Sequence, residues 1–117
     1  MATDFRSGHD FPRRGREEFG GYYWLLRVFD KGRAAHNGTI HDYIYPCPLD
    51  KGVFERWGIT PADFDAALET AHTDEEILAW VKSRVPEARR IETNRWVIEE
   101  KTKSLDKQDL EEGVVAV

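Results

Sequence analysis

Residues 22–36 read YYWLLRVFDKGRAAH, and this proline-free run predicts a helix around which the rest of the chain folds. Its apolar side chains recur at helical spacing from Tyr22 to about His36. At about 100° per residue, the clearly polar positions form one narrow strip: Tyr23, Arg27, Asp30, Lys31 and Ala34. Apolar side chains cover most of the remaining circumference, so we expect this helix to be central and nearly surrounded.

Local signals on the C-terminal side of this run mark further helices. Asn37-Gly38 suits a C-terminal cap, because glycine readily adopts positive φ. A short helix from about residue 49 is closed by Gly58. Thr60 and Thr73 are each followed by an acidic residue three positions later, which predicts helices over about residues 61–71 and from residue 74. A last helix is expected over residues 87–103, with a strand over residues 95–98 as the alternative.

These elements predict a mainly α, compact single-domain fold of about five helices. Residues 1–21 are expected to form an N-terminal arm, residues 22–103 the helical domain and residues 104–117 a flexible C-terminal tail. Near residues 41–46, alternation predicts a short extended segment with His41, Tyr43 and Tyr45 on one side.

The composition excludes several classes of protein. The 117 residues carry 17 basic and 22 acidic side chains, a formal charge of −5, and duplex nucleic acid is therefore not an expected partner. The single cysteine rules out an internal disulfide framework. There is no phosphate-binding glycine loop, so no cofactor is expected. With no long apolar run and no signal-peptide character at the N-terminus, we expect a soluble, cytoplasmic protein without a membrane partner.

Arg33 conflicts with its predicted position, because it lies in the apolar arc of the helix, where an unpaired charge is costly. Two interpretations are open. In the first, Arg33 forms a structural ion pair with Asp42 or Asp50, and Arg27 and Lys31 are merely solvated. In the second, Arg33 clamps a carboxylate or phosphate of a ligand in bidentate fashion. The candidate ligand-binding residues are Arg27, Asp30, Lys31, Arg33 and Asp50.

The segment YIYPCPLD, residues 43–50, holds a second set of candidates. Cys47 is expected near the N-terminus of a short helix, where the helix dipole and free amides favour a thiolate. The candidate catalytic residues are His41, Tyr43, Tyr45 and Cys47. The alternative is that this cysteine is a small buried apolar side chain and that the tyrosines belong to the core. A metal site built from His36, His41, Cys47 and Asp50 matches no recurrent ligand spacing, so no metal is predicted.

Two stretches, Asp30-Lys31-Gly32-Arg33-Ala34 and Tyr43 to Asp50, resemble the bacterial family known as domain of unknown function 5069. The resemblance runs from about Phe11 to Trp80 and implies one small domain. It implies no established activity, so no catalytic residues are transferred. Gly32 departs from the expected pattern, and we expect it to admit the close approach of another backbone.

Two functional hypotheses follow. The first is a pocket between the residue 22–36 helix and residues 43–50, binding a small anionic metabolite, with acid-base or thiol chemistry as its catalytic form. The second is an interaction or regulatory module without a ligand, in which aromatic residues and the tail with residues 114–117 form a homodimer or a complex with a basic partner. Single-stranded nucleic-acid binding through Arg13 to Arg16 is a weaker third, because the total charge opposes it.

Overall fold

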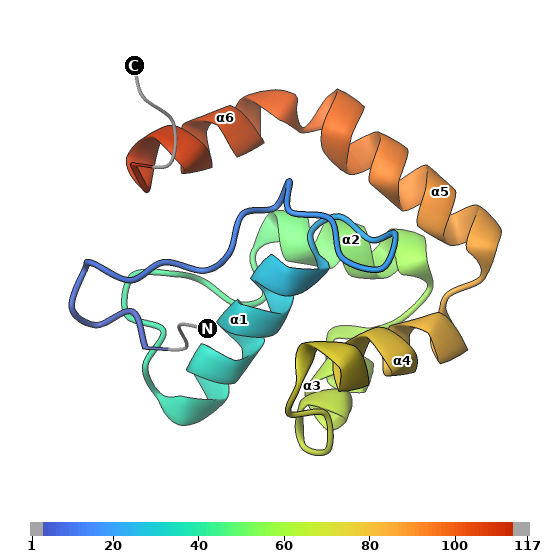
Figure 1. Cartoon of the computed structure of the whole chain (residues 1–117), viewed down its shortest axis with the longest axis horizontal. Coiled ribbons are helices and arrows are strands. Elements are labelled where there is room, and N and C mark those ends of the chain that lie inside the picture. Colours follow the sequence, from blue (N-terminus) through green and yellow to red (C-terminus); the bar gives the residue numbers. More distant parts are fainter. Residues whose placement is uncertain (1–3, 114–117) are drawn as a thin grey trace.

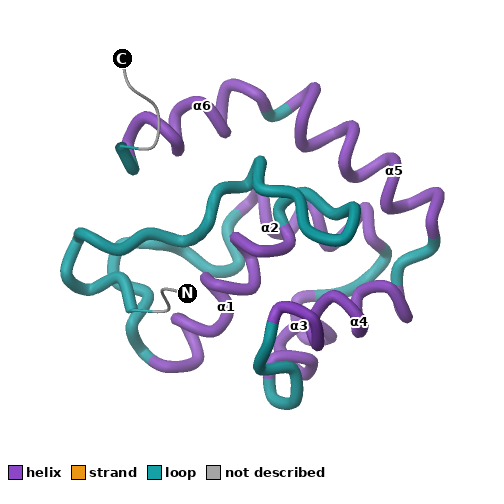
Figure 2. Tube along the Cα trace, viewed as in Figure 1, coloured by secondary structure: helices purple, strands orange, loops and turns teal. Residues whose placement is uncertain are grey.

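The computed structural model describes residues 4–113. Within this range the chain is mainly helical and has no strand, as predicted (Figures 1 and 2). Its helices in chain order are α1 (Leu25–Asn37), α2 (Pro48–Trp57), α3 (Pro61–Leu68), α4 (Asp74–Arg84), α5 (Glu87–Arg95), the π-helix η1 (Trp96–Glu100) and α6 (Thr102–Glu111). None of the helices in the described range is long and apolar enough to cross a membrane.

Helix α1 begins three residues later than predicted. Trp24 has a φ of 72°, a left-handed conformation that cannot belong to the helix, and Phe19 pairs with Tyr22 in a tight turn just before it. The helix ends as predicted, because Gly38 also has a φ of 72° and its N–H donates to carbonyls of the last turn.

The capping signals after α1 are confirmed. Thr60 and Thr73 each accept a hydrogen bond from the backbone N–H three residues later, and the acidic residue there bonds back in a capping box. Gly58 closes α2 with a φ of 84°. Helix α3 is shorter than predicted and ends at Leu68.

The hydrophobic core combines side chains of α1 with those of α2, α3 and α4, and Figure 1 shows these helices beside one another. The largest fully buried side chains include Trp24, Phe29, Phe54, Trp57 and Phe64. This burial confirms the prediction that α1 is central.

At Gly32, side chains of neighbouring segments pack closely against α1. The expectation that another backbone approaches α1 there is wrong. A Cβ there would lie 2.7 Å from Cδ1 of Leu68 and 3.4 Å from the ring of Tyr45. Two side chains from neighbouring segments thus fill the space that a larger residue would need.

The N-terminal arm crosses α1 and is fastened to it by charge. Arg13 donates to Asp30 of α1 at 2.8 Å and to Asp74 of α4 at 2.7 Å. Arg14 and Arg16 both donate to Asp109 of α6, at 2.7 and 3.0 Å. In Figure 1 the arm, in blue, therefore lies between α1 and α6, and three guanidinium groups join elements far apart in sequence.

Residues 104–111, which the sequence predicts to lie in a flexible tail, belong to helix α6. The reason is a stripe with helical spacing, Leu105, Asp109 and Glu112, whose three residues are all buried. Leu105 would contact a Cβ placed on Gly15 of the arm at 2.8 Å. Residues 114–117, expected to fray or to self-associate, lie outside the described range.

Two further segments differ from their predictions. The helix expected over residues 87–103 is divided by η1, which lies where the alternative strand was considered. The π-helix brings the indole of Trp96 against Gly52 of α2. Residues 41–42 and 45–46 lie in turns, and His41 has a φ of 57°, so the segment near residues 41–46 is not regularly extended throughout.

We expect Gly52→Ala to destabilise the protein by about 1–3 kcal/mol, because a Cβ there would lie 2.4 Å from Cη2 of Trp96. Alanine is otherwise more favourable than glycine in a helix interior, so a loss of stability would identify the contact with Trp96 as its cause. Urea denaturation gives the free energy of unfolding, with Lys51→Ala on the exposed face of α2 as the control. A Gly52→Ala protein as stable as the wild type would show that the indole of Trp96 does not pack tightly against α2.

We expect Asp109→Asn to flatten the acid dependence of stability. Hydrogen bonds from the Arg14 side chain, reinforced by Arg16, hold the pKa of Asp109 below its ordinary value of 3.8. The carboxylate therefore contributes stability that is complete above about pH 4 and is lost as pH falls through the lowered pKa. The Asn variant should be less stable at pH 7 and lose less stability on acidification, whereas Glu75→Gln on the exposed face of α4 should keep the wild-type slope. Equal slopes in urea denaturation between about pH 5 and pH 2 would contradict this assignment.

Candidate functional site

A pocket of about 480 Å³ lies where four segments meet. Its walls come from residues 5–11 of the arm, Arg27 and Lys31 of α1, residues 41–47, and residues 108–112 at the end of α6. In Figure 1 this is the side of the molecule where the arm, the turn after α1 and the end of α6 come together. The position agrees with the pocket predicted between the first helix and residues 43–50.

The first polar group in the pocket wall joins Arg27, Glu112 and Tyr43. The two terminal nitrogens of Arg27 donate to the two carboxylate oxygens of Glu112 at 3.0 and 2.7 Å. The hydroxyl of Tyr43 donates to Oε2 of Glu112 at 2.8 Å. Only 3% of the Arg27 side chain and 5% of the Glu112 side chain are exposed. A carboxylate thus sits in a buried, bidentate clamp that a tyrosine completes.

Burial and hydrogen bonding fix the protonation of this group. Burial, and then the hydrogen bond to Glu112, raise the pKa of Tyr43 well above its ordinary value, so its hydroxyl is a hydrogen-bond donor at neutral pH. Burial by itself lowers the pKa of the Arg27 guanidinium. The hydrogen bonds to Glu112 outweigh this effect, so the pKa is raised above its ordinary value.

The second polar group joins Lys31, Asp50 and Cys47. The ammonium of Lys31 donates to Oδ2 of Asp50 at 2.7 Å and lies 3.2 Å from Sγ of Cys47. Asp50 also accepts from the indole N–H of Trp24 at 2.8 Å and from the backbone N–H of Cys47 at 2.9 Å. Cys47 is the N-cap of α2, as predicted, and Sγ accepts from the backbone N–H of Asp50 at 3.4 Å.

Two polar atoms in residues that line the pocket have no partner among residues 4–113. Nε of Arg27 and Oε1 of Gln108 are buried and form no hydrogen bond within this part of the chain. A buried polar atom without a partner costs about 1–3 kcal/mol.

The pocket brings together five of the residues singled out from the sequence: Arg27, Lys31, His41, Tyr43 and Cys47. Asp50 lies behind Lys31 and is fully buried. The interpretation in which Arg27 and Lys31 are merely solvated is wrong, because the arm and α6 cover them and Glu112 and Asp50 neutralise their charge. The polar strip of α1 is thus a buried face.

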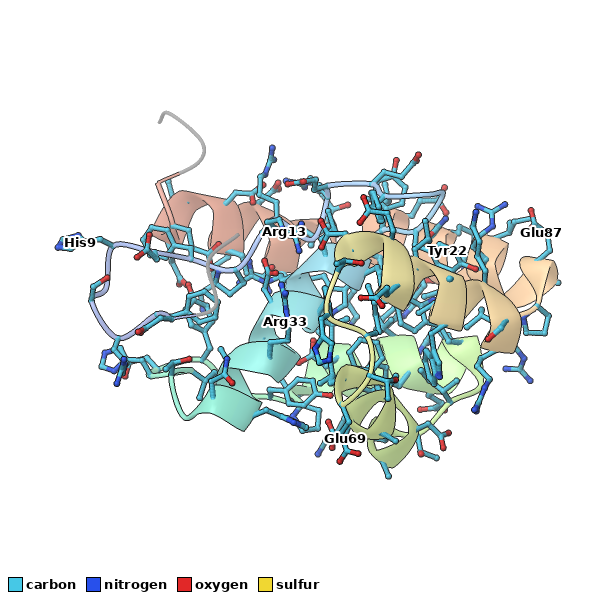
Figure 3. All side chains as sticks on the ribbon, turned by 60° about the horizontal axis from the view of Figure 1, so that its bottom comes forward. His9, Arg13, Tyr22, Arg33, Glu69 and Glu87 are labelled. Atoms are coloured by element: carbon cyan, nitrogen blue, oxygen red, sulfur yellow. The ribbon has the colours of Figure 1, made fainter. Side chains whose placement is uncertain are left out.

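Arg33 lies elsewhere, and the predicted ion pair with Asp42 or Asp50 is wrong. Its guanidinium donates to Asp30 one turn earlier at 3.0 Å and stacks 3.8 Å from the centre of the Phe29 ring. Figure 3 shows Arg13 and Arg33 approaching each other from the arm and from α1, and Asp30 accepts from both. Arg33 borders a separate pocket of about 360 Å³, so Arg33 and Cys47 do not share a site.

Tyr45 and His41 do not join Tyr43 in a common row. The hydroxyl of Tyr45 donates to Asp65 of α3 at 2.7 Å, and its ring packs edge-on against Phe54 in the core. His41 is half exposed, with Nε2 3.3 Å from Asp42 at the rim of the pocket. The positive φ of His41 breaks the alternation that predicted a shared face.

Glu112 is the charged residue of the clamp that the sequence interpretation missed. Its spacing from Leu105 and Asp109 is a helical signal that was available, but its partner Arg27 is 85 positions away. Among residues 4–113, no group of three or more histidine, cysteine or acidic side chains is placed to hold a metal ion.

A family model described as a domain of unknown function (DUF5069) matches residues 9–116. The match covers nearly the whole chain and extends the resemblance seen from Phe11 to Trp80 through α6. No curated protein matches the chain.

We expect Asp50→Asn to lower the free energy of unfolding by about 3–5 kcal/mol, because it leaves the buried ammonium of Lys31 without a counter-charge. Asp63→Asn is the matched control, since Asp63 has the same capping-box position in α3 but is solvated, and its loss should be about 1 kcal/mol or less. Urea denaturation measures both variants. Equal losses would mean that Asp50 acts only as a helix cap.

Proposed function

Because the chain belongs to the DUF5069 family, whose description names no activity, we propose its function from the site itself: the protein binds a small anionic metabolite in the pocket between α1 and residues 41–47. Arg27 and Lys31 are four positions apart on α1, so both cations reach the same pocket from one rigid helix. Tyr43 and Cys47 add a hydroxyl and a thiol from the opposite segment.

The observation that carries this proposal is the buried Arg27 guanidinium in the pocket wall, with Nε still unpartnered among the described residues. A guanidinium has five N–H donors in a fixed plane, and low local polarity strengthens each bond to an anion. The ring of Trp24 lies 5.7 Å from this group and helps to hold it in place. The cation is therefore preorganised for an anion.

The pocket also has the groups for acid-base or thiol chemistry on a bound anion. Tyr43 supplies an O–H donor, since its raised pKa keeps it protonated. The Lys31 ammonium lies 3.2 Å from Sγ of Cys47, and the backbone N–H of Asp50 in the first turn of α2 donates to the same sulfur at 3.4 Å. In this proposal Cys47 is the nucleophile and Tyr43 the proton donor, while His41 at the rim remains exposed to solvent.

We expect at least one class in a panel of monocarboxylates, dicarboxylates and phosphate esters to raise the thermal midpoint. A ligand at 100 times its dissociation constant adds about 2.7 kcal/mol of stability, which is a shift of several degrees for a chain of this size. Arg27→Met and Lys31→Met should abolish the shift in protein that circular dichroism shows to be folded. Arg33→Met, on the same helix but at a separate pocket, should keep it.

An unchanged midpoint across the panel at saturating concentrations would contradict the proposal, as would a shift lost equally in all three variants. The variant Cys47→Ala distinguishes simple binding of the anion from thiol chemistry on it. If the variant still binds the anion but no longer converts it, Cys47 carries thiol chemistry. If the variant still converts the anion, Cys47 is not part of the mechanism.

A further inference from the structure

We infer that the anion is a monocarboxylate with an apolar body and that it binds by displacing the carboxylate of Glu112 from Arg27. The inference rests on the proposed function, because it assigns a ligand class and a mode of regulation to the same pocket. Glu112 then competes with the ligand for Arg27.

The first argument is the geometry of the clamp. Arg27 holds Glu112 through two parallel hydrogen bonds of 3.0 and 2.7 Å, and Tyr43 adds a third of 2.8 Å. Two parallel N–H donors match the spacing of the two oxygens of a carboxylate. All three donors come from segments other than the one that carries Glu112, so a free carboxylate in the same place would meet the same contacts.

The second argument is that Glu112 is free to leave without unfolding α6. It follows Glu111, the last residue of the helix, and precedes Gly113, whose φ of 69° marks a turn. Helix α6 is fastened separately, because Arg14 and Arg16 hold Asp109 one turn earlier. Rotation of the Glu112 side chain toward solvent therefore breaks only the clamp.

The third argument concerns the rest of the ligand. Next to the clamp the pocket is lined by Phe5, Phe11 and Ile44, and the rings of Phe5 and Tyr43 meet edge to face at 5.4 Å. These side chains favour an apolar body of the size of a phenyl ring.

The rim of the same pocket selects against a second negative charge. Three exposed acidic residues lie there: Asp10, Asp42 and Glu111. Like charges facing one another reduce affinity, so dicarboxylates and phosphates are disfavoured.

Displacement has a quantitative consequence. The apparent affinity of the ligand is reduced by the fraction of molecules in which Glu112 has released Arg27. Removing Glu112 should therefore tighten binding, an effect opposite in sign to the loss expected for a residue that contacts the ligand directly.

The test is calorimetric titration of the full chain with sodium benzoate, with succinate and inorganic phosphate as comparison anions. We expect Glu112→Ala to bind benzoate about tenfold more tightly than the wild type. Glu111→Ala removes the same charge from the rim without touching the clamp and should change the affinity by about threefold or less. In Glu112→Ala, benzoate should also raise the thermal midpoint more than sodium chloride at equal ionic strength.

The outcomes separate this inference from the proposed function. Equal benzoate affinity in wild type and Glu112→Ala overturns the competition by Glu112 and leaves the anion pocket intact. Tighter binding of succinate or phosphate than of benzoate overturns the ligand class. Absence of binding by every anion to both proteins means that the proposed function itself fails. If Glu112→Ala does not fold, Glu112→Gln, which keeps the shape and loses the charge, gives the same comparison.

Discussion

Buried charge on α1 organises the packing of this protein. Arg27, Asp30 and Lys31 lie on one helix beside the aromatic core, and each is almost fully removed from water. A buried charge without a partner is strongly destabilising, so each needs an opposite charge from another segment. Glu112, Arg13 and Asp50 supply them, which fixes the end of α6, the arm and the start of α2 against one helix.

The elements are attached to α1 in two different ways. Helices α2, α3 and α4 are held by aromatic side chains such as Phe54, Trp57 and Phe64, whose burial is favourable wherever they fit. The arm and the end of α6 are held to α1 by the guanidinium–carboxylate pairs Arg13–Asp30 and Arg27–Glu112, which need matched geometry. A carboxylate in such a pair can be exchanged for another carboxylate, whereas a packed aromatic ring has no such substitute.

The pocket is a consequence of the same pairing. Glu112 and Asp50 neutralise Arg27 and Lys31, and both residues also line the pocket between the arm and residues 41–47. The contacts that satisfy the core charges thus also place two cations at a cavity wall. The Arg13 and Arg33 contacts to Asp30 lie away from this pocket, and the Arg13 contact attaches the arm to α1.

The sequence by itself determined the mainly helical class and the helix ends whose signals lie within a few residues, such as Thr60, Thr73 and Gly58. Those ends follow from hydrogen bonds that the chain satisfies locally, and local residues report them. Contacts between distant segments were needed to establish that the polar strip of α1 faces inward, that Thr102–Glu111 forms helix α6 and that Arg27 meets Glu112. Whether a charged side chain is buried depends on a partner that another segment brings to it, here from 85 positions away, and no local pattern identifies that partner.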